Sequence, residues 1–223
     1  MLVTSTDRYL GNWVNSVQEG YGQEEYLDGD VYKGNFKNGL KSGLGKFIWA
    51  DGTYYEGNFE NDLLCGKGSL KWCDGRSYHG EWLNNKMHGH GTFTWPGGKS
   101  YVGEYRNDKK EGHGTYYWNE EKYYSGHWNN NKQHGEGIFY LKGSSFEVMY
   151  RFGKLISTTT IGKKEVEVAN VQAIEKNICE EIMAPLDENI NINIRTDSGK
   201  NNMEKVMLEE SNSKEKIETR KKQ

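Results

Sequence analysis

The stretch Tyr78-His79-Gly80-Glu81-Trp82 contains the pattern that decides the fold. Side chains of a β-strand alternate between two faces, so the two rings and Gly80 are expected on one face, with His79 and Glu81 on the other. Residues 89–95 (GHGTFTW) alternate in the same way, with the glycines, Phe93 and Trp95 on one face. The intervening pair Asn84-Asn85 tolerates the positive φ of a tight turn. The whole stretch therefore predicts a β-hairpin.

The same hairpin recurs six times without insertion. Its first ring begins a Tyr-x-Gly-x-aromatic unit at Tyr9, Tyr32, Tyr55, Tyr78, Tyr101 and Tyr124. A Gly-x-Gly pair keeps the same step, and Asp-Gly or Gly-Gly pairs mark most connections between copies. Glu120-Glu121 departs from that pattern and predicts a looser connection there. Such periodicity is typical of a repeat protein. It predicts an all-β, elongated and twisted antiparallel meander of about twelve strands.

The composition predicts a core made of rings rather than aliphatic side chains. Aromatic residues make up 13% of the chain, and 28 glycines stand against 2 prolines. Glycine in a strand marks a place where another group approaches the backbone closely. We therefore expect aromatic side chains to lie over the glycines on one face of the sheet, as in aromatic rescue. The other face is expected to carry polar residues such as Lys33, Glu56 and Glu104.

Residues 9 to 153 resemble the MORN (membrane occupation and recognition nexus) repeat. The resemblance rests on Tyr-x-Gly-x-Trp, then Asn, then Gly-x-Gly, then an aromatic residue and Asp-Gly. A seventh, atypical copy begins at residues 146–150 (FEVMY), where Val148 replaces the expected glycine. We interpret this copy as a cap, because terminal repeats are usually atypical.

The resemblance implies scaffolding or partner binding. MORN arrays occur in radial spoke heads of cilia, in junctophilins and in cortical scaffolds of protozoan parasites. They also occur beside enzyme domains in plant phosphatidylinositol phosphate kinases and in one class of histone lysine methyltransferase, where the chemistry belongs to a separate domain. The resemblance therefore predicts a non-catalytic protein without a cofactor.

The composition changes after the array, which gives three predicted regions. Residues 1–153 form the array, 154–186 a linker with an amphipathic helix, and 187–223 a disordered polar tail. Within 165–183, apolar residues recur at helical steps, and Pro185 follows them. These residues are Val168, Val171, Ile174, Ile178 and Ile182. This helix is expected either to cover the last strand or part of the aromatic face, or to bind a partner or a second copy.

Enzymatic and metal chemistry find little support in the sequence. A phosphate loop needs a helix directly after its glycines, whereas strands follow them here. His90 and His113 are one copy apart, about 9–10 Å, which is too far for shared zinc binding unless both rings lean inward. His88 and His134 complete no site with them. Glu81 and Glu104 have the same one-copy separation and are better explained as solvated charges. No catalytic, cofactor-binding or metal-ligating residue is therefore predicted.

Two ladders of rings are the candidate partner-binding residues. They are Trp49, Trp72, Trp95 and Trp118, and Tyr55, Tyr78, Tyr101 and Tyr124. One interpretation makes them the core of the fold. In the other, some rings stay exposed and bind a partner helix or strand, for which Tyr and Trp are well suited. Both can hold at once.

Net charge and cysteine content limit the possible ligands and the cellular compartment. A net charge of -3 disfavours nucleic-acid binding, which depends on phosphate neutralisation. Three cysteines without a CxxC pair are typical of free thiols in a reducing compartment. No apolar span of membrane length and no secretory signal are found. These features predict a cytoplasmic protein.

Three functions remain open. The first is a structural protein that binds protein partners in a cytoskeletal assembly, such as a ciliary or flagellar axoneme or the cell cortex. The second is a module that binds an anionic membrane surface, to which Lys33, Lys46, Lys71 and Lys99 could contribute. The third is an accessory part of an enzyme such as a lipid kinase.

Overall fold

A computed structural model describes residues 8–162 of the 223-residue chain. The chain divides into two units, Met1–Ile190 and Asn191–Gln223, and all of the described residues belong to the first. The helix predicted within 165–183 and the tail predicted at 187–223 lie outside the described residues, and both stay predictions.

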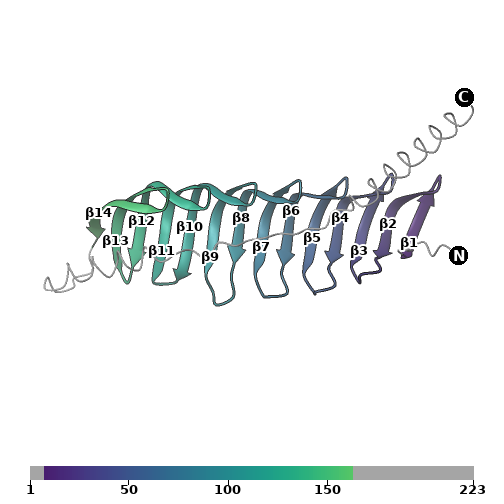
Figure 1. Cartoon of the computed structure of the whole chain (residues 1–223), viewed down its shortest axis with the longest axis horizontal. Coiled ribbons are helices and arrows are strands. Elements are labelled where there is room, and N and C mark those ends of the chain that lie inside the picture. The colour runs from purple at the N-terminus through teal and green to yellow at the C-terminus, as the bar shows by residue number, and fades with distance from the viewer. Residues whose placement is uncertain (1–7, 163–223) are drawn as a thin grey trace, which may run out of the picture. The chain divides into compact units, whose positions relative to one another are not determined.

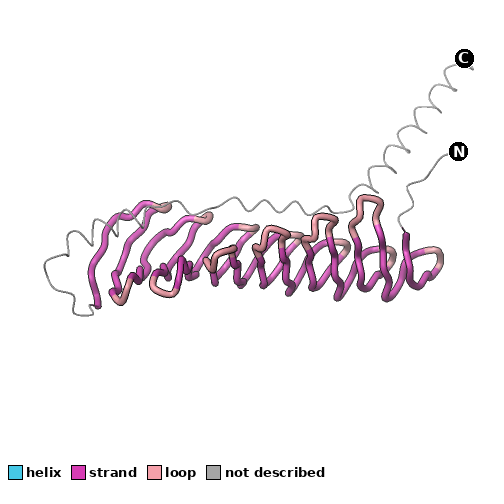
Figure 2. The backbone as a smooth tube through the Cα atoms, turned by 90° about the horizontal axis from the view of Figure 1, so that it is seen from below, coloured by secondary structure: helices cyan, strands magenta, loops and turns pink. Residues whose placement is uncertain are grey.

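Residues 8–162 form a single open sheet of fourteen antiparallel strands, each paired with its neighbours in sequence (Figure 1). This confirms the predicted all-β meander, and Figure 2 shows only strands and their connections in this part of the chain. The strands are β1 (Arg8–Val14), β2 (Val17–Glu25), β3 (Val31–Lys37), β4 (Leu40–Ile48), β5 (Tyr54–Glu60), β6 (Leu63–Lys71), β7 (Ser77–Leu83), β8 (Lys86–Thr94), β9 (Ser100–Arg106), β10 (Lys109–Asn119), β11 (Lys122–Asn129), β12 (Lys132–Leu141), β13 (Ser144–Arg151) and β14 (Lys154–Gly162).

The turns within copies have the predicted geometry. Asn84 and Asn85 both have positive φ, 50° and 66°, as a two-residue hairpin turn requires. The connections between regular copies are longer. The connection at Glu120-Glu121 was expected to be loose, but it is a two-residue turn closed by the pair Asn119↔Lys122. β10 continues to Asn119 through a bulge after Tyr117, so fewer residues are left for the turn.

The core consists of tyrosines that lie flat over pairs of glycines. A Cβ built on Gly80 or on Gly91, its partner across the hairpin, would collide with the ring of Tyr78. The Tyr78 hydroxyl donates a hydrogen bond to the Glu81 carbonyl, at 3.0 Å. The same arrangement recurs in each of the six regular copies. The expected overlay of rings on glycines is thus present, and each ring belongs to the hairpin that it covers.

These tyrosines and the rings four residues after them form a continuous edge-to-face row, here called the tyrosine row. Trp82, for example, lies 5.5 Å from Tyr55 of the preceding copy and 5.1 Å from its own Tyr78, between ring centroids. Edge-to-face pairs at this distance add about 0.5–1.5 kcal/mol each beyond their buried area. The row contains Trp13, Tyr9, Phe36, Tyr32, Phe59, Tyr55, Trp82, Tyr78, Tyr105, Tyr101, Trp128, Tyr124 and Tyr150.

The first glycine of each Gly-x-Gly pair has a different role from the second. Gly89 was expected on the same face as Gly91, but its φ is +55° and its hypothetical Cβ would meet the Glu81 carboxylate on the opposite face. The register of β7 and β8 shifts at this point, between Gly80 and Glu81. Gly89 is therefore a bulge residue, and a bulge interrupts the two-residue alternation on which the expectation depended.

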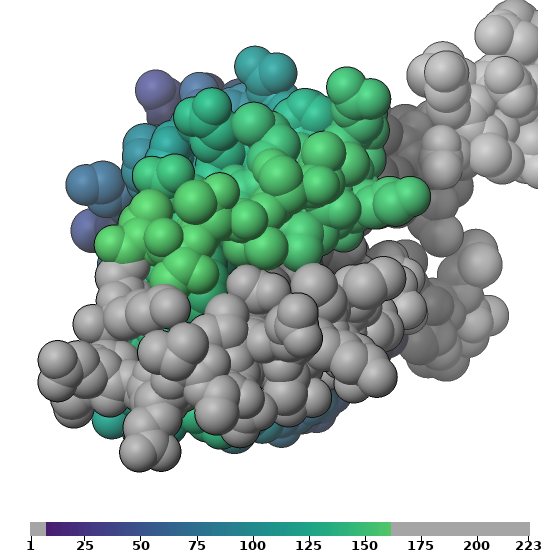
Figure 3. All heavy atoms as spheres, turned by 90° about the vertical axis from the view of Figure 1, so that its left-hand side faces the viewer, coloured from purple at the N-terminus to yellow at the C-terminus, as the bar shows by residue number. Residues whose placement is uncertain are grey.

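The last hairpin, β13–β14, differs from the others. Its second strand occupies residues 154–162, which the sequence analysis assigned to the beginning of the linker, because β14 lacks the Gly-x-Gly signal. Val148 stands where the other copies have glycine and pairs with Gly137. The surface of this end of the sheet is seen in Figure 3.

Candidate partner-binding surface

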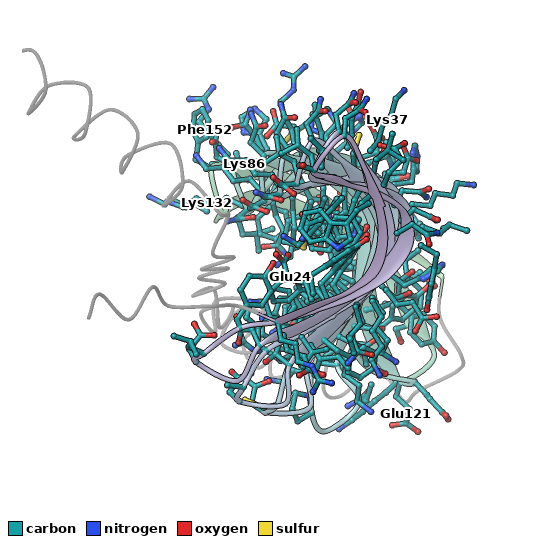
Figure 4. All side chains as sticks on the ribbon, turned by 90° about the vertical axis from the view of Figure 1, so that its right-hand side faces the viewer. Glu24, Lys37, Lys86, Glu121, Lys132 and Phe152 are labelled. Carbon is teal, nitrogen blue, oxygen red and sulfur yellow. The ribbon has the colours of Figure 1, made fainter. Side chains whose placement is uncertain are left out.

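The curvature of the sheet separates an inner face from an outer face. Seen along the sheet, the strands curve around the aromatic side chains, which gather on the inner side (Figure 4). All eight predicted ring residues lie on this face, but their exposure differs. Tyr55, Tyr78, Tyr101 and Tyr124 are completely buried, whereas Trp49, Trp72, Trp95 and Trp118 are half-buried. Only the tryptophans offer accessible surface in this structure.

The four tryptophans belong to a second line of rings near the connections between copies, here called the tryptophan row. Phe93 lies between Trp72 and Trp95, at centroid distances of 5.3 and 4.3 Å. Tyr116 lies in the same way between Trp95 and Trp118, at 5.5 and 4.7 Å. Each tryptophan therefore stacks on buried rings and keeps part of its surface accessible on the inner face.

Two residues depart from the regular pattern of the tryptophan row. Tyr26 takes the tryptophan position in the first copy, 5.9 Å from Phe47. Leu70 takes the phenylalanine position in the third, so the row of rings is interrupted between Trp49 and Trp72. The tryptophan row is therefore most continuous from Trp72 onward.

Two buried lysines lie beneath these rows. Lys110 is almost fully buried, with its ammonium 5.2–5.5 Å from the ring centres of Trp95, Tyr101, Tyr116 and Trp128. Lys41, at the equivalent position three copies earlier, lies 3.8 Å from Glu24 and 3.7 Å from Asp62. The equivalent residues Leu64 and Met87 are apolar. Cation–π attraction and ion pairing offset the desolvation of the two charges.

Charge along the inner face changes sign from one end of the array to the other. The residue two positions before each tyrosine is Asp30, Thr53, Arg76, Lys99 and Lys122 in successive copies. Glu24 adds a second buried carboxylate at the N-terminal end. Arg76 and Lys122 lie over Trp72 and Trp118, at 5.2 and 5.1 Å from the ring centres. The tryptophan row is therefore flanked by cations in its C-terminal half.

The pKa shifts on the inner face arise mainly from burial. Desolvation raises the pKa of the Tyr78 and Tyr101 phenols above the ordinary value, so both hydroxyls stay protonated. Burial also raises the pKa of Asp108, against opposing effects from the Met87 amide and Lys86. These shifts follow from packing and do not assemble an acid and a base around a common point.

The outer face contains a hollow that the sequence analysis did not foresee. It has a volume of about 550 Å³ and is lined by His113, His127, Glu136 and neighbouring residues of β10–β14. The two histidine rings are directly opposed across β10 and β11, with centroids 4.2 Å apart. From the sequence, His113 was weighed as a metal ligand together with His90, although the hairpin register could have indicated His127 as its neighbour. Within residues 8–162, no three His, Cys, Asp or Glu side chains are placed to hold a metal ion.

The lysines considered for membrane binding do not form a single patch. Lys33 and Lys46 are cross-strand neighbours on the outer face, and Lys46 is paired with Glu56 at 3.3 Å. Lys99 belongs to the inner face, where it precedes Tyr101 by two residues. No helix capable of crossing a bilayer is found in the part of the chain that the structure describes.

The family assignment agrees with this geometry. The family profile described as "MORN repeat" matches six segments, residues 9–31, 32–54, 55–75, 78–100, 101–120 and 124–145. The chain belongs to the MORN repeat family. Its matched segments coincide with the six regular hairpin copies, and the β13–β14 hairpin follows the last of them. MORN repeats are generally modules that bind proteins or membranes.

Among solved structures, the chain is similar to the TCP domain of SAS-4 (dCPAP) from Drosophila melanogaster, solved in complex with a proline-rich motif of Ana2 (dSTIL). The identity is 11% and the TM-score 0.40, over 70% of this chain and 90% of that one. No curated protein matches the chain.

Proposed function

We propose that this MORN array is a non-catalytic scaffold that binds a protein segment along its inner face, within a cytoskeletal assembly such as a ciliary axoneme or the cell cortex. The observation that carries the proposal is the half-buried tryptophan row beside a completely buried tyrosine row. The tyrosines are already used by the fold, whereas the tryptophans combine fixed positions with accessible surface. Rigid aromatic side chains of this kind dominate many protein interfaces.

The spacing of the copies favours a helical partner. One copy contains two strands, so equivalent tryptophans are separated by about 9.5–10 Å along the sheet. Seven residues of an α-helix rise about 10.5 Å, a close match. A partner helix with an apolar side chain at every seventh position would therefore meet successive tryptophans.

The binding face can be tested by pull-down and mass spectrometry with the full chain and a Trp72→Ala/Trp95→Ala variant. We expect the variant to stay folded and to lose its main protein partners. A matched control is Tyr21→Ala/Leu44→Ala, which removes two exposed apolar side chains from the outer face. An unchanged set of partners in a folded Trp72→Ala/Trp95→Ala variant would contradict the proposed binding face.

The cytoskeletal setting needs a separate experiment. We expect the chain to sediment with axonemes or cytoskeleton after detergent extraction, and complete release by detergent would contradict this setting. Flotation with anionic vesicles at physiological salt tests the membrane alternative. Because Lys46 is paired and Lys99 lies on the other face, we expect no flotation; strong flotation would favour lipid over protein binding.

A further inference from the structure

The last described strand ends at the edge of the sheet that carries the tryptophan row. Even-numbered strands run toward this edge, and Trp72 and Trp95 directly follow β6 and β8. β14 runs in the same direction, and its last residue, Gly162, pairs with Ser145 beside the β12–β13 connection. The chain therefore continues after Gly162 from the tryptophan edge, at the C-terminal end of the row.

Leu141 takes the tryptophan position in the last regular copy. It stands 23 residues after Trp118, and both side chains are half-buried. Leu141 pairs with Lys122, whose ammonium lies 5.1 Å from the ring centre of Trp118. Side chains of paired residues point to the same face of a sheet, so Leu141 belongs to the inner face. The row thus ends in two accessible apolar side chains, one copy or about 9.5–10 Å apart.

Residues 165–183, here called the helix segment, match this spacing in their sequence. They lie outside the described residues and carry the apolar pattern of an amphipathic helix. Val171 and Ile178 are seven residues apart, which corresponds to a rise of about 10.5 Å in an α-helix. Seven residues after Ile178 stands Pro185, where the predicted helix has ended. The helix segment therefore fits two positions of the row and does not extend to a third.

The helix segment is long enough to reach both positions from the end of β14. Leu141 ends β12, two strands before β14, and Trp118 lies near the end of β10, four strands before it. These separations are about 10 and 19 Å along the sheet. A helix that begins at residue 165 brings Val171 within about 19 Å of the end of β14 and Ile178 within about 30 Å. Each side chain can therefore lie at its row position when the helix runs back across the sheet.

We propose that the helix segment binds, within the same molecule, to the C-terminal end of the tryptophan row. Val171 contacts Leu141, and Ile178 contacts Trp118. Only two residues separate the helix segment from β14, so its effective concentration at the row is on the order of millimolar. Two apolar contacts can therefore form within one molecule, although they would be too weak between separate molecules.

The contact limits the partner site at one end of the row. Trp72 and Trp95 follow β6 and β8, farther from β14 than the two covered positions, and both stay accessible. The protein segment assigned to this face by the proposed function would then bind at Trp72 and Trp95, beside the helix segment. The contact within the molecule does not itself depend on that partner.

Disulfide trapping in the full chain tests the position of the helix segment. The background carries three substitutions, Cys65→Ser, Cys73→Ser and Cys179→Ser. In this background Ile178→Cys with Trp118→Cys should form an intramolecular disulfide under mild oxidation. The matched control is Ile178→Cys with Tyr117→Cys, because Tyr117 is exposed and points to the opposite face; its cross-linking should be at least tenfold slower. Equal rates in the two pairs, or a disulfide between molecules in place of the intramolecular one, would overturn the proposal.

Hydrogen exchange in the full chain tests whether the apolar side chains make the contact. Ile174→Asp/Ile178→Asp places two charges on the apolar stripe, and amide exchange within the helix segment should become at least tenfold faster. Ala169→Asp/Ala173→Asp adds the same charges on the opposite side of the predicted helix and should leave exchange close to that of the parent chain. This control is strict, because alanine is the better helix former and its replacement lowers helix propensity more. Similar exchange in the parent chain and both variants would refute the contact.

These tests are separate from the pull-down of the Trp72→Ala/Trp95→Ala variant, because those two tryptophans lie outside the proposed contact. Failure of the trapping, with partner binding that still depends on Trp72 and Trp95, would contradict the helix-segment contact alone. Trapping between Ile178→Cys and Trp118→Cys, with an unchanged set of partners in the Trp72→Ala/Trp95→Ala variant, would support the contact and contradict only the proposed binding face.

Discussion

The tyrosine row and the tryptophan row are built from the same kinds of side chain on the same face, but they differ in burial. The tyrosines lie on glycines, which lets each ring approach the backbone closely and fill the concave side of its own hairpin. Trp49, Trp72 and Trp95 directly follow β4, β6 and β8, and Trp118 lies near the end of β10. These tryptophans stack on rings of their own copy and of the next, as Trp95 and Trp72 do on Phe93. A ring that lies over a glycine therefore belongs to the core, whereas a ring beside a connection between copies keeps part of its surface accessible.

The largest effect is expected from removing a ring of the tyrosine row. Tyr78→Ala deletes a completely buried side chain, two ring contacts and a hydrogen bond to Glu81. Large-to-small substitution of buried aromatic residues costs about 3–5 kcal/mol. We expect a loss of this size in urea unfolding followed by circular dichroism. A loss below about 1 kcal/mol would contradict the core role of the row.

Adding a methyl group beneath the same ring should have a smaller effect. In Gly91→Ala the new Cβ would overlap Tyr78, so the ring must move, at a cost of about 1–3 kcal/mol. In the control Gly97→Asn nothing lies within 4 Å of the Cβ position, so only the strain of the positive φ (88°) is expected, which asparagine tolerates better than most side chains. Thermal melting should separate the two variants; equal melting temperatures would show that Tyr78 does not depend on the glycine beneath it.

The sequence was sufficient to predict the hairpin, the order of the strands and the overlay of rings on glycines, because all three follow from a short pattern repeated in phase. It was not sufficient for Gly89, since a bulge breaks the alternation that the pattern assumes. The sequence predicted that some rings could stay exposed but not which, because burial depends on neighbouring copies and on the curvature of the sheet. The pairing of His113 with His127 follows the same register as His90 with Glu104 one copy earlier, so the repeat could have indicated it.

Truncation in the tryptophan row should affect stability less and binding more. Trp95 is half-buried and keeps contacts only with Phe93, Tyr116 and the Lys110 ammonium among the described interactions. Trp95→Ala is therefore expected to cost about 1–2 kcal/mol in urea unfolding, in the middle of the range for single substitutions. The affinity for a protein partner should fall at least tenfold in the same variant. If Trp95→Ala destabilised the chain as much as Tyr78→Ala, the distinction between the two rows would fail.

The smallest effect concerns the turns opposite the tryptophan row, where the second turn residue accepts a hydrogen bond from the preceding copy. Asp108 Oδ1 accepts from the Met87 amide at 2.8 Å, and Asn131 Oδ1 accepts from the Lys110 amide at 2.7 Å. Burial raises the pKa of Asp108, so its ionised form is disfavoured in the folded state. Stability from this group is complete below the ordinary pKa of 3.8 and is lost as the pH rises through the raised value.

Asp108→Asn keeps an oxygen that accepts the hydrogen bond from the Met87 amide, and it removes the loss of stability that ionisation of the carboxyl causes. We expect the variant to gain about 0.5–1 kcal/mol over the parent chain at pH 7 and less at pH 4, measured by urea unfolding at both values. Asp62→Asn is the contrasting change, because Asp62 lies 3.7 Å from the buried Lys41 ammonium and its charge is compensated there. That variant should lose stability at pH 7. If both substitutions changed the free energy of unfolding at pH 7 in the same direction, the Lys41 ammonium would not account for the difference between the two turns.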